Sequence, residues 1–162
     1  MKACEIVGRF NDCFACAANT TMIGGAQEPL YLPAATGRRA RLLFREDFAA
    51  SALHEAAHWC IAGRRRLEQR DFGYTYVAPP RNAQQQAAFF LAELKAQSLE
   101  SIFADAAGVA FWPSADNLDA CTERFSARIR ASRPALETWL RTSSDARART
   151  FLASLRKSHG AG

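Results

Sequence analysis

The 162-residue sequence contains no long apolar run, no internal repeat and no low-complexity segment. No stretch approaches the roughly 18 apolar residues that cross a bilayer, so we expect no membrane partner. Hydrophobic residues make up 49% and charged residues 23% of the chain, which excludes a disordered or collagen-like protein. The length corresponds to one domain, and we expect a single folded unit over residues 1–162.

Cysteine is scarce, odd in number and irregularly spaced. The chain has five cysteines, and no second CxxC accompanies Cys13-Phe-Ala-Cys16. A disulfide framework uses paired cysteines, and a structural zinc site needs four ligands. Charged residues also interrupt the apolar core that an export signal would need near the start of the sequence. We therefore expect reduced, mostly buried thiols in a cytoplasmic protein.

The net charge of +5 is concentrated at one end of the chain. Residues 122–162 carry 9 Lys and Arg against 3 Asp and Glu, whereas residues 1–121 carry 12 against 13. We expect residues 122–162 to form a basic, helical C-terminal part. A nucleic-acid-binding module would depend on this part and on Arg64-Arg65-Arg66. The chain has no zinc-finger spacing and no aromatic RNA-binding signature, so we expect no direct nucleic-acid partner.

Hydrophobic periodicity predicts a helix-rich α+β fold, in which helices surround a small sheet. The predicted helices are 3–17, 47–63 beginning at Asp47, 83–110 as one helix or two, an apolar stripe from Leu118 to Ile129, a helix capped by Ser132, and a last helix capped by Ser144 or Asp145. The predicted strands are 30–32, 41–44 and 72–77. Residues 20–27 contain Gly24-Gly25 and are predicted to be a loop.

Two of the three histidines form an HExxH motif, His54-Glu55-Ala56-Ala57-His58. Positions i and i+4 of a helix share a face, so both imidazoles can bind one metal ion. Glu55 points in a neighbouring direction, from which its carboxylate could reach a metal-bound water. The motif therefore predicts a metal site on the helix over residues 47–63.

Two histidines leave a metal site incomplete, so a third ligand must come from elsewhere in the chain. The candidates are downstream carboxylates in helical surroundings: Glu68, Asp71, Glu93, Glu100 and Asp105. Glu93 follows the apolar stretch 87–92, where a carboxylate is costly unless it is paired or binds a metal. Alternatively, Glu93 lies on the solvent face of its helix. The residues alone leave this choice open.

Several blocks of the sequence resemble the bacterial elongation factor P hydroxylase family. The blocks are residues 28–34, residues 51–63 with HEAAHWCIAG, Asp71-Phe72-Gly73-Tyr74, Arg81 with residues 83–86, and Asp116-Asn117-Leu118. They extend over roughly residues 5–120, and we identify no resemblance beyond that point. The resemblance implies a non-haem Fe(II) oxygenase that uses dioxygen. It also implies that the β-lysylated lysine of elongation factor P, an acidic protein, is hydroxylated.

The resemblance also implies roles for individual residues. His54, His58 and Glu93 would hold the iron, although zinc or another divalent metal could occupy the purified protein. Glu55 would act as a catalytic residue that moves a proton or orients a histidine. Polar and aromatic residues near the site in sequence are candidates for lining the substrate channel: Tyr74, Tyr76, Arg81 and Gln86. Because the implied partner is acidic, the Arg-rich helices with Arg128, Arg130 and Arg133 are candidates for steering it electrostatically.

A zinc metallopeptidase is the alternative function. Thermolysin-like peptidases hold zinc with the same three types of ligand, and the Glu of HExxH is the general base for a zinc-bound water.

Overall fold

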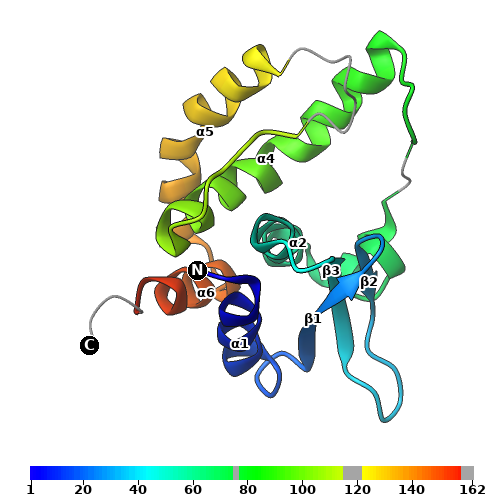
Figure 1. Ribbon diagram of the computed structural model, residues 1–162, viewed down its shortest axis with the longest axis vertical. Coiled ribbons are helices and arrows are strands. Elements are labelled where there is room, and N and C mark those ends of the chain that lie inside the picture. The colour runs from blue at the N-terminus through cyan, green and yellow to red at the C-terminus, as the bar shows by residue number, and fades with distance from the viewer. Residues whose placement is uncertain (75–76, 115–121, 158–162) are drawn as a thin grey trace.

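The computed structural model describes residues 1–74, 77–114 and 122–157. A three-stranded sheet of order β1-β3-β2 lies at one side of the protein, and helices pack against one of its faces (Figure 1). The helix-rich α+β class expected from the sequence is therefore confirmed. Within the described ranges, no helix combines the length and apolar character needed to cross a membrane.

The sheet consists of β1 (Thr20–Ala26), β2 (Leu30–Leu32) and β3 (Ala40–Arg45). The central strand β3 pairs in parallel with β1 and antiparallel with β2. Its alternate residues Ala40, Leu42 and Phe44 are buried, as a strand with one face on the core requires. The flanking prolines suit β2 to its position at the edge of the sheet.

Strand β1 occupies residues that the sequence predicted to be a loop, so that prediction was wrong. The Gly24-Gly25 pair permits a bulge in the strand rather than a turn, since the register shifts between Ile23 and Ala26. A Cβ atom at Gly24 would lie 2.7 Å from the Phe44 ring, and Gly25 has a φ of +87°. Gly24 is therefore required by the close packing of β1 against β3, and Gly25 is favoured by its positive φ.

The described part of the segment 72–77 does not form the predicted strand. Residues Arg70–Gly73 form a 3₁₀ turn, η1, in which Asp71 and Phe72 have φ values of 48° and 57°. The Asp71 carboxylate accepts a hydrogen bond from the backbone N–H of Tyr31 at 2.9 Å, and the Tyr31 and Phe72 rings stack at 4.4 Å. These tertiary contacts offset the left-handed backbone strain and override the local β propensity. Residues 75 and 76 lie outside the described ranges.

The helices follow the predicted order with changed boundaries. They are α1 (Ala3–Phe14), α2 (Ala49–Ile61), α3 (Arg64–Leu67), α4 (Ala83–Ala107), α5 (Glu123–Thr142) and α6 (Arg147–Arg156). Phe48 rather than Asp47 is the N-cap of α2. Helix α4 is continuous: the Asn82 side chain caps its start, and Gly108 ends it in the left-handed conformation with a φ of 63°.

Helix α5 replaces two predicted helices, and Pro134 lies inside it. Ser132 was expected to cap a new helix, but its hydroxyl instead donates to the Ile129 carbonyl at 2.9 Å and contacts the Ser98 hydroxyl of α4 at 2.5 Å. The favourable free energy of packing against α4 thus exceeds the cost of the backbone hydrogen bond that a proline removes from a helix. Leu118 and Cys121, which were assigned to the preceding stripe, lie outside the described residues.

The thiols agree with only part of the prediction. Cys4, Cys13, Cys16 and Cys60 are free, as expected, but of these four only Cys60 is buried. Cys13 and Cys16 lie at and beyond the end of the amphipathic helix α1, whose core-facing positions are taken by Ala3, Ile6, Phe10 and Phe14. Cys121 lies outside the described residues.

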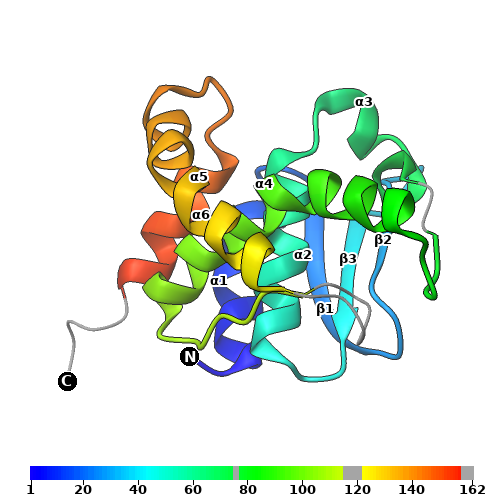
Figure 2. The same cartoon turned by 90° about the horizontal axis from the view of Figure 1, so that it is seen from above.

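Helix α2 lies between β3 and α4, at the centre of the protein (Figures 1 and 2). Its Trp59 belongs to a buried aromatic cluster in which neighbouring ring centroids are 4.7–5.5 Å apart: Phe10, Phe14, Trp59, Phe103 and Phe151. Such pairs add about 0.5–1.5 kcal/mol each beyond their buried area. The helix that carries HExxH is thus held on several sides.

Arg147 fastens the end of α2 to α6. Its guanidinium donates to the carbonyl oxygens of Trp59 at 2.8 Å and Ala62 at 2.6 Å, and it lies 4.8 Å from the Trp59 ring centroid. These carbonyls have no partner further along α2 because the helix ends there. Asp145 completes the arrangement by accepting hydrogen bonds from Arg147.

We expect Arg147→Ala to lower the free energy of unfolding by about 2–3 kcal/mol, because charge-assisted hydrogen bonds to two helix-terminal carbonyls are lost. Urea denaturation followed by circular dichroism measures this change. Arg130→Ala, at an exposed position on α5, is the control and should shift the midpoint little. Equal effects of the two substitutions would contradict the role given to Arg147.

Candidate metal centre

The two histidines of HExxH lie on the side of α2 that faces α4. Their ring nitrogens converge: Nε2 of His54 and Nε2 of His58 are 3.1 Å apart. The side chains are 26% and 12% exposed, so both are largely withdrawn from water. The i, i+4 spacing therefore produces the shared face expected from the motif.

Helix α4 supplies a stripe of polar side chains opposite these histidines. Glu93, Gln97 and Glu100 follow one another at i, i+4 and i+7, which places them on one face of a helix. Glu93 Oε1 is 3.2 Å from His58 Nε2, and Glu93 Oε2 is 3.5 Å from His54 Nε2. The structure thus brings Glu93 and both histidines together.

The spacing of these three donors fits a divalent metal ion. One atom from each of His54, His58 and Glu93 lies within 4.8 Å of the others. Two donors bound at about 2.1 Å to one ion, at angles between octahedral and tetrahedral, lie about 3.0–3.4 Å apart. Two imidazoles and one carboxylate suit both Fe(II) and Zn(II).

Three of the other candidates for the third metal ligand lie in different environments. Glu68 is exposed, and Asp105 pairs with Arg133 at 2.6 Å. Asp71 accepts from the backbone of Tyr31, as described above. Glu93 itself is only 13% exposed, so it does not lie on a solvent face.

Glu100 has a different part in the site, which sequence reasoning did not assign to it. Its Oε2 is 2.7 Å from Nδ1 of His54, on the side of the ring away from Glu93. A carboxylate that accepts from one ring nitrogen leaves the other nitrogen free to bind a metal. Orienting the histidine was one role considered for Glu55, but the structure places Glu100 in that position. The i+7 spacing from Glu93 was the signal available in the sequence.

Gln97 plays a similar part for Glu93. Its amide nitrogen lies 3.3 Å from Glu93 Oε2 and 2.9 Å from the Ser114 carbonyl, and its oxygen accepts from the Ser114 backbone N–H at 2.9 Å. The side chain is 1% exposed, so these hydrogen bonds are protected from water. Gln97 therefore connects the carboxylate to the segment after α4, and sequence reasoning missed it.

The electrostatics of the cluster favour the charged forms of His54 and Glu93 despite their burial. Burial alone would lower the pKa of His54, but the hydrogen bond to Glu100 and the charges of Glu100, Glu55 and Glu93 raise it to about 10. Burial alone would raise the pKa of Glu93, but His58, His54 and Gln97 lower it to about 2. At neutral pH and without a metal, His54 is therefore protonated on both ring nitrogens and positively charged, and Glu93 is ionised.

Glu55 is buried beside the same histidines. Burial is the main cause of its raised pKa, which the interactions with His54 and His58 lower only in part. Its side chain lines the cavity in front of His54 and His58. A carboxylate with a raised pKa next to a metal site can take up and release a proton.

The cavity has a volume of about 770 Å³, within the usual range for small-molecule sites. Its lining includes aromatic residues and carboxylates from several elements: Glu28, Tyr31, Glu55, Asp71, Phe72, Tyr74, Phe89 and Glu93. The Phe72 ring lies 6.4 Å from that of His58, so the strained turn η1 forms one wall.

Two of the four expected channel residues line this cavity. Tyr74 does so and holds the Arg66 guanidinium 4.3 Å above its ring. Arg81 also does so, with Nε donating to the Val77 carbonyl at 2.7 Å. Gln86 is not part of the lining, because α4 turns Gln85, Ala88 and Ala92 toward the cavity instead. Tyr76 lies outside the described residues.

The fold and the site define a class of protein: a helix-rich α+β domain whose HExxH helix and a carboxylate from a second helix form a candidate metal centre. Comparison with known proteins gives the family. The elongation factor P hydroxylase family matches residues 9–161. The chain belongs to this family. The match continues well beyond residue 120, where the resemblance was expected to end, so that expectation was wrong.

A curated relative supports the same assignment. The chain is 43% identical over 116 residues to the elongation factor P lysine hydroxylase of Haemophilus influenzae. The aligned part covers 71% of this chain and 65% of the length of that protein.

We expect binding of a divalent ion at pH 7.5 to release about one proton, because the ion must displace the proton on His54. Isothermal titration calorimetry with Zn(II), in buffers that differ in ionisation enthalpy, measures the number released. Apparent affinity should rise with pH and level off as pH approaches 10. Binding that is independent of buffer would contradict the protonation given to His54.

We expect Glu100→Gln to lower the pKa of His54, because the amide keeps a hydrogen-bond acceptor but removes the negative charge. The number of protons released at pH 8.5 should then fall toward zero. The same calorimetry tests this, and an NMR titration of the metal-free protein follows His54 directly. Glu68→Gln removes an exposed charge as a control and should leave the release at about one proton. An unchanged release in Glu100→Gln would reject the pairing.

Proposed function

We propose that this chain is an iron-dependent oxygenase that hydroxylates the β-lysylated lysine side chain of elongation factor P. The observation that carries the proposal is the convergence of His54, His58 and Glu93 in the lining of a cavity, in a chain of the elongation factor P hydroxylase family. The name of the relative, a lysine hydroxylase acting on elongation factor P, supports the same residue type and partner.

His54, His58 and Glu93 are the proposed iron ligands. Fe(II) held by two imidazoles and one carboxylate supplies activation of dioxygen, because such a set leaves coordination positions open. Glu100 holds His54 in the ring orientation that keeps Nε2 directed at Glu93. Gln97 holds the Glu93 carboxylate from the other side. The chain thus holds two of the three proposed ligands through hydrogen bonds from behind, as precise positioning requires.

The cavity suits a cationic side chain. The carboxylates of Glu28, Glu55 and Asp71 line it, and Arg81 brings a positive charge to the same lining. The aromatic rings of Tyr31, Phe72 and Tyr74 add faces that attract ammonium groups. A lysine extended by β-lysine carries ammonium groups on a long aliphatic stem. The carboxylates would attract the ammonium groups of such a substrate, and the aromatic rings would contact its aliphatic stem.

Glu55 is the proposed catalytic carboxylate. Burial raises its pKa above that of an ordinary carboxylate, which suits the group to holding a proton, and it lines the cavity together with the ligand histidines. We propose that Glu55 moves a proton during turnover rather than binding the metal. The proposal also places the chain in the cytoplasm with its protein substrate and assigns it no nucleic-acid or membrane partner.

A zinc metallopeptidase is the second candidate, because a buried Glu55 beside two histidines is also what that chemistry needs. Membership of the hydroxylase family favours the oxygenase. The two functions differ in their products, since a peptidase shortens its substrate and an oxygenase adds an oxygen atom.

We expect elongation factor P carrying the β-lysyl group to gain the mass of one oxygen atom when incubated with this protein, Fe(II), a reductant and air. His54→Ala and Glu93→Ala should abolish the gain, because each removes a proposed ligand and leaves an incomplete site. Intact-mass spectrometry measures the product. Glu68→Ala, which removes an exposed carboxylate, is the matched control and should keep full activity.

Two results would reject the proposal. One is an unmodified substrate after incubation with metal-loaded wild-type protein. The other is cleavage of the substrate supported by Zn(II) and lost in Glu55→Gln, which would establish the peptidase. A fully active Glu93→Ala would reject Glu93 as the third ligand while leaving the reaction itself standing.

A further inference from the structure

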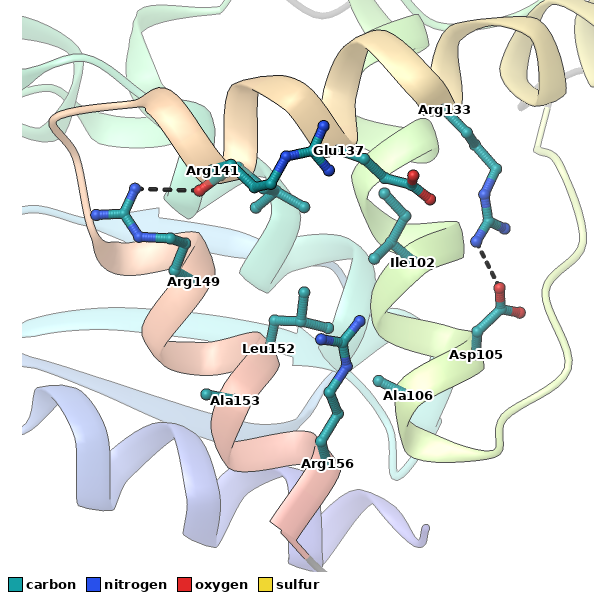
Figure 3. A pocket seen from close by; sticks show the side chains of 11 residues that line it. Ile102, Asp105, Ala106, Arg133, Glu137, Arg141, Arg149, Leu152, Ala153 and Arg156 are labelled. Atoms are coloured by element: carbon teal, nitrogen blue, oxygen red, sulfur yellow. Dashed lines mark hydrogen bonds and ion pairs between the residues drawn. The ribbon is translucent and has the colours of Figure 1, made fainter.

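A second pocket of about 770 Å³ lies between α4, α5 and α6, away from the metal centre (Figure 3). As far as the chain is described, its lining shares no residue with the cavity in front of the histidines. Asp105 on its rim is 12 residues along α4 from Glu93, which corresponds to about 18 Å. The reacting side chain therefore does not occupy this pocket when it reaches the metal centre.

The pocket combines an apolar floor with a basic rim. Ile102 and Ala106 of α4, Leu140 of α5, and Leu152 and Ala153 of α6 form the apolar part. Arginines from two helices surround it: Arg133 and Arg141 of α5, and Arg149 and Arg156 of α6 (Figure 3). Asp105 and Glu137 are the acidic residues in the lining, so the rim has a net charge of +2.

The four arginines differ in how many hydrogen-bond and ion-pair partners the protein provides for their guanidinium groups. Arg133 pairs with Asp105 at 2.6 Å. Arg149 donates to the carbonyl oxygens of Leu140 and Ser143 at the end of α5. Arg141 has only the Thr138 hydroxyl at 3.1 Å, and Arg156 has no hydrogen-bond or ion-pair partner within the described residues. Arg141 and Arg156 are thus the two guanidinium groups available to a bound anion.

We propose that this pocket binds an acidic segment of the protein substrate, with carboxylates on Arg141 and Arg156 and an apolar side chain on the floor between them. This inference rests on the proposed function, because it takes elongation factor P as the partner. It deepens that function by giving the partner a second point of attachment outside the metal cavity. Opposite charge on the two surfaces would speed their encounter and set their orientation.

The lining favours a protein segment over nucleic acid. Among the described residues, no aromatic side chain belongs to it, so bases would find no stacking platform. The carboxylates of Asp105 and Glu137 would also repel a continuous phosphate backbone. An amphipathic acidic segment avoids both problems, since it needs only separated carboxylates and one apolar contact.

The pocket also distinguishes among the arginines that the sequence suggested for steering an acidic partner. Of the three arginines expected to steer the partner, Arg133 lines the pocket, but Arg128 and Arg130 do not. They are exposed on α5 and contribute only to the general charge of the surface. They therefore provide a control in which the same charge is removed from outside the pocket.

The test compares three variants of the full chain for binding to β-lysylated elongation factor P. Arg141→Glu/Arg156→Glu should raise Kd, and KM in the hydroxylation assay, about tenfold, while kcat at saturating substrate stays unchanged. Arg128→Glu/Arg130→Glu makes the same change in net charge and should alter both less than about twofold. Ala153→Trp fills the pocket without changing charge and should also raise Kd several-fold.

Biolayer interferometry gives Kd without turnover, and circular dichroism confirms that each variant is folded. Equal weakening by the two charge variants, or no weakening by the pocket variants, would overturn the pocket proposal. Pocket-dependent binding without any gain of oxygen would reject the proposed function alone, whereas oxygen gain with unaltered KM in the pocket variants would reject the pocket alone. Failure of the wild type to bind elongation factor P would reject both. Preferential binding of single-stranded RNA at the pocket would replace the protein partner with a nucleic acid.

Discussion

The packing of α2 against α4 is the constraint on which the site depends. It buries ionisable side chains from both helices, and each would be costly there alone. The contact between His54 and Glu100 at 2.7 Å, together with the approach of Glu93 to both histidines, compensates the charges across the helix interface. Further contacts hold α2 in place: the Trp59 ring packs on Phe10, and Arg147 donates to the Trp59 carbonyl. A preformed pair of imidazoles facing a carboxylate is the result.

The surface divides into two regions with opposite chemistry. The cavity at the candidate metal centre is lined by carboxylates and aromatic rings, which attract cations. The pocket between α4, α5 and α6 has an arginine rim, which attracts anions. A protein substrate with a cationic reacting side chain and an acidic surface would be complementary to both. The modest net charge of +5 hides this division, because the two regions partly cancel.

Local rules predicted much of the fold, and tertiary contacts account for the errors. Periodicity located α2 and α4, because apolar residues three and four positions apart form a continuous stripe only on a helix. The prediction was wrong at Gly24-Gly25, because glycines usually indicate a turn. Here they allow a bulge in β1 that packs on Phe44. The prediction was also wrong at Phe72, whose β propensity is overridden by stacking on Tyr31. The sequence also predicted two helices where the single helix α5 contains Pro134, because the contact of α5 with α4 is not visible in a local stretch of sequence.

By itself, the sequence determined that His54 and His58 share a face, since a spacing of four residues in a helix has that consequence in any fold. It also predicted a third ligand from elsewhere in the chain, with five downstream carboxylates as candidates. Only the tertiary structure decided which carboxylate joins the two histidines. Glu93 and Glu100 lie on the same face of α4, and the crossing of α4 over α2 places the first between the imidazoles and the second behind one of them. That crossing depends on packing across the whole core, which no local spacing encodes.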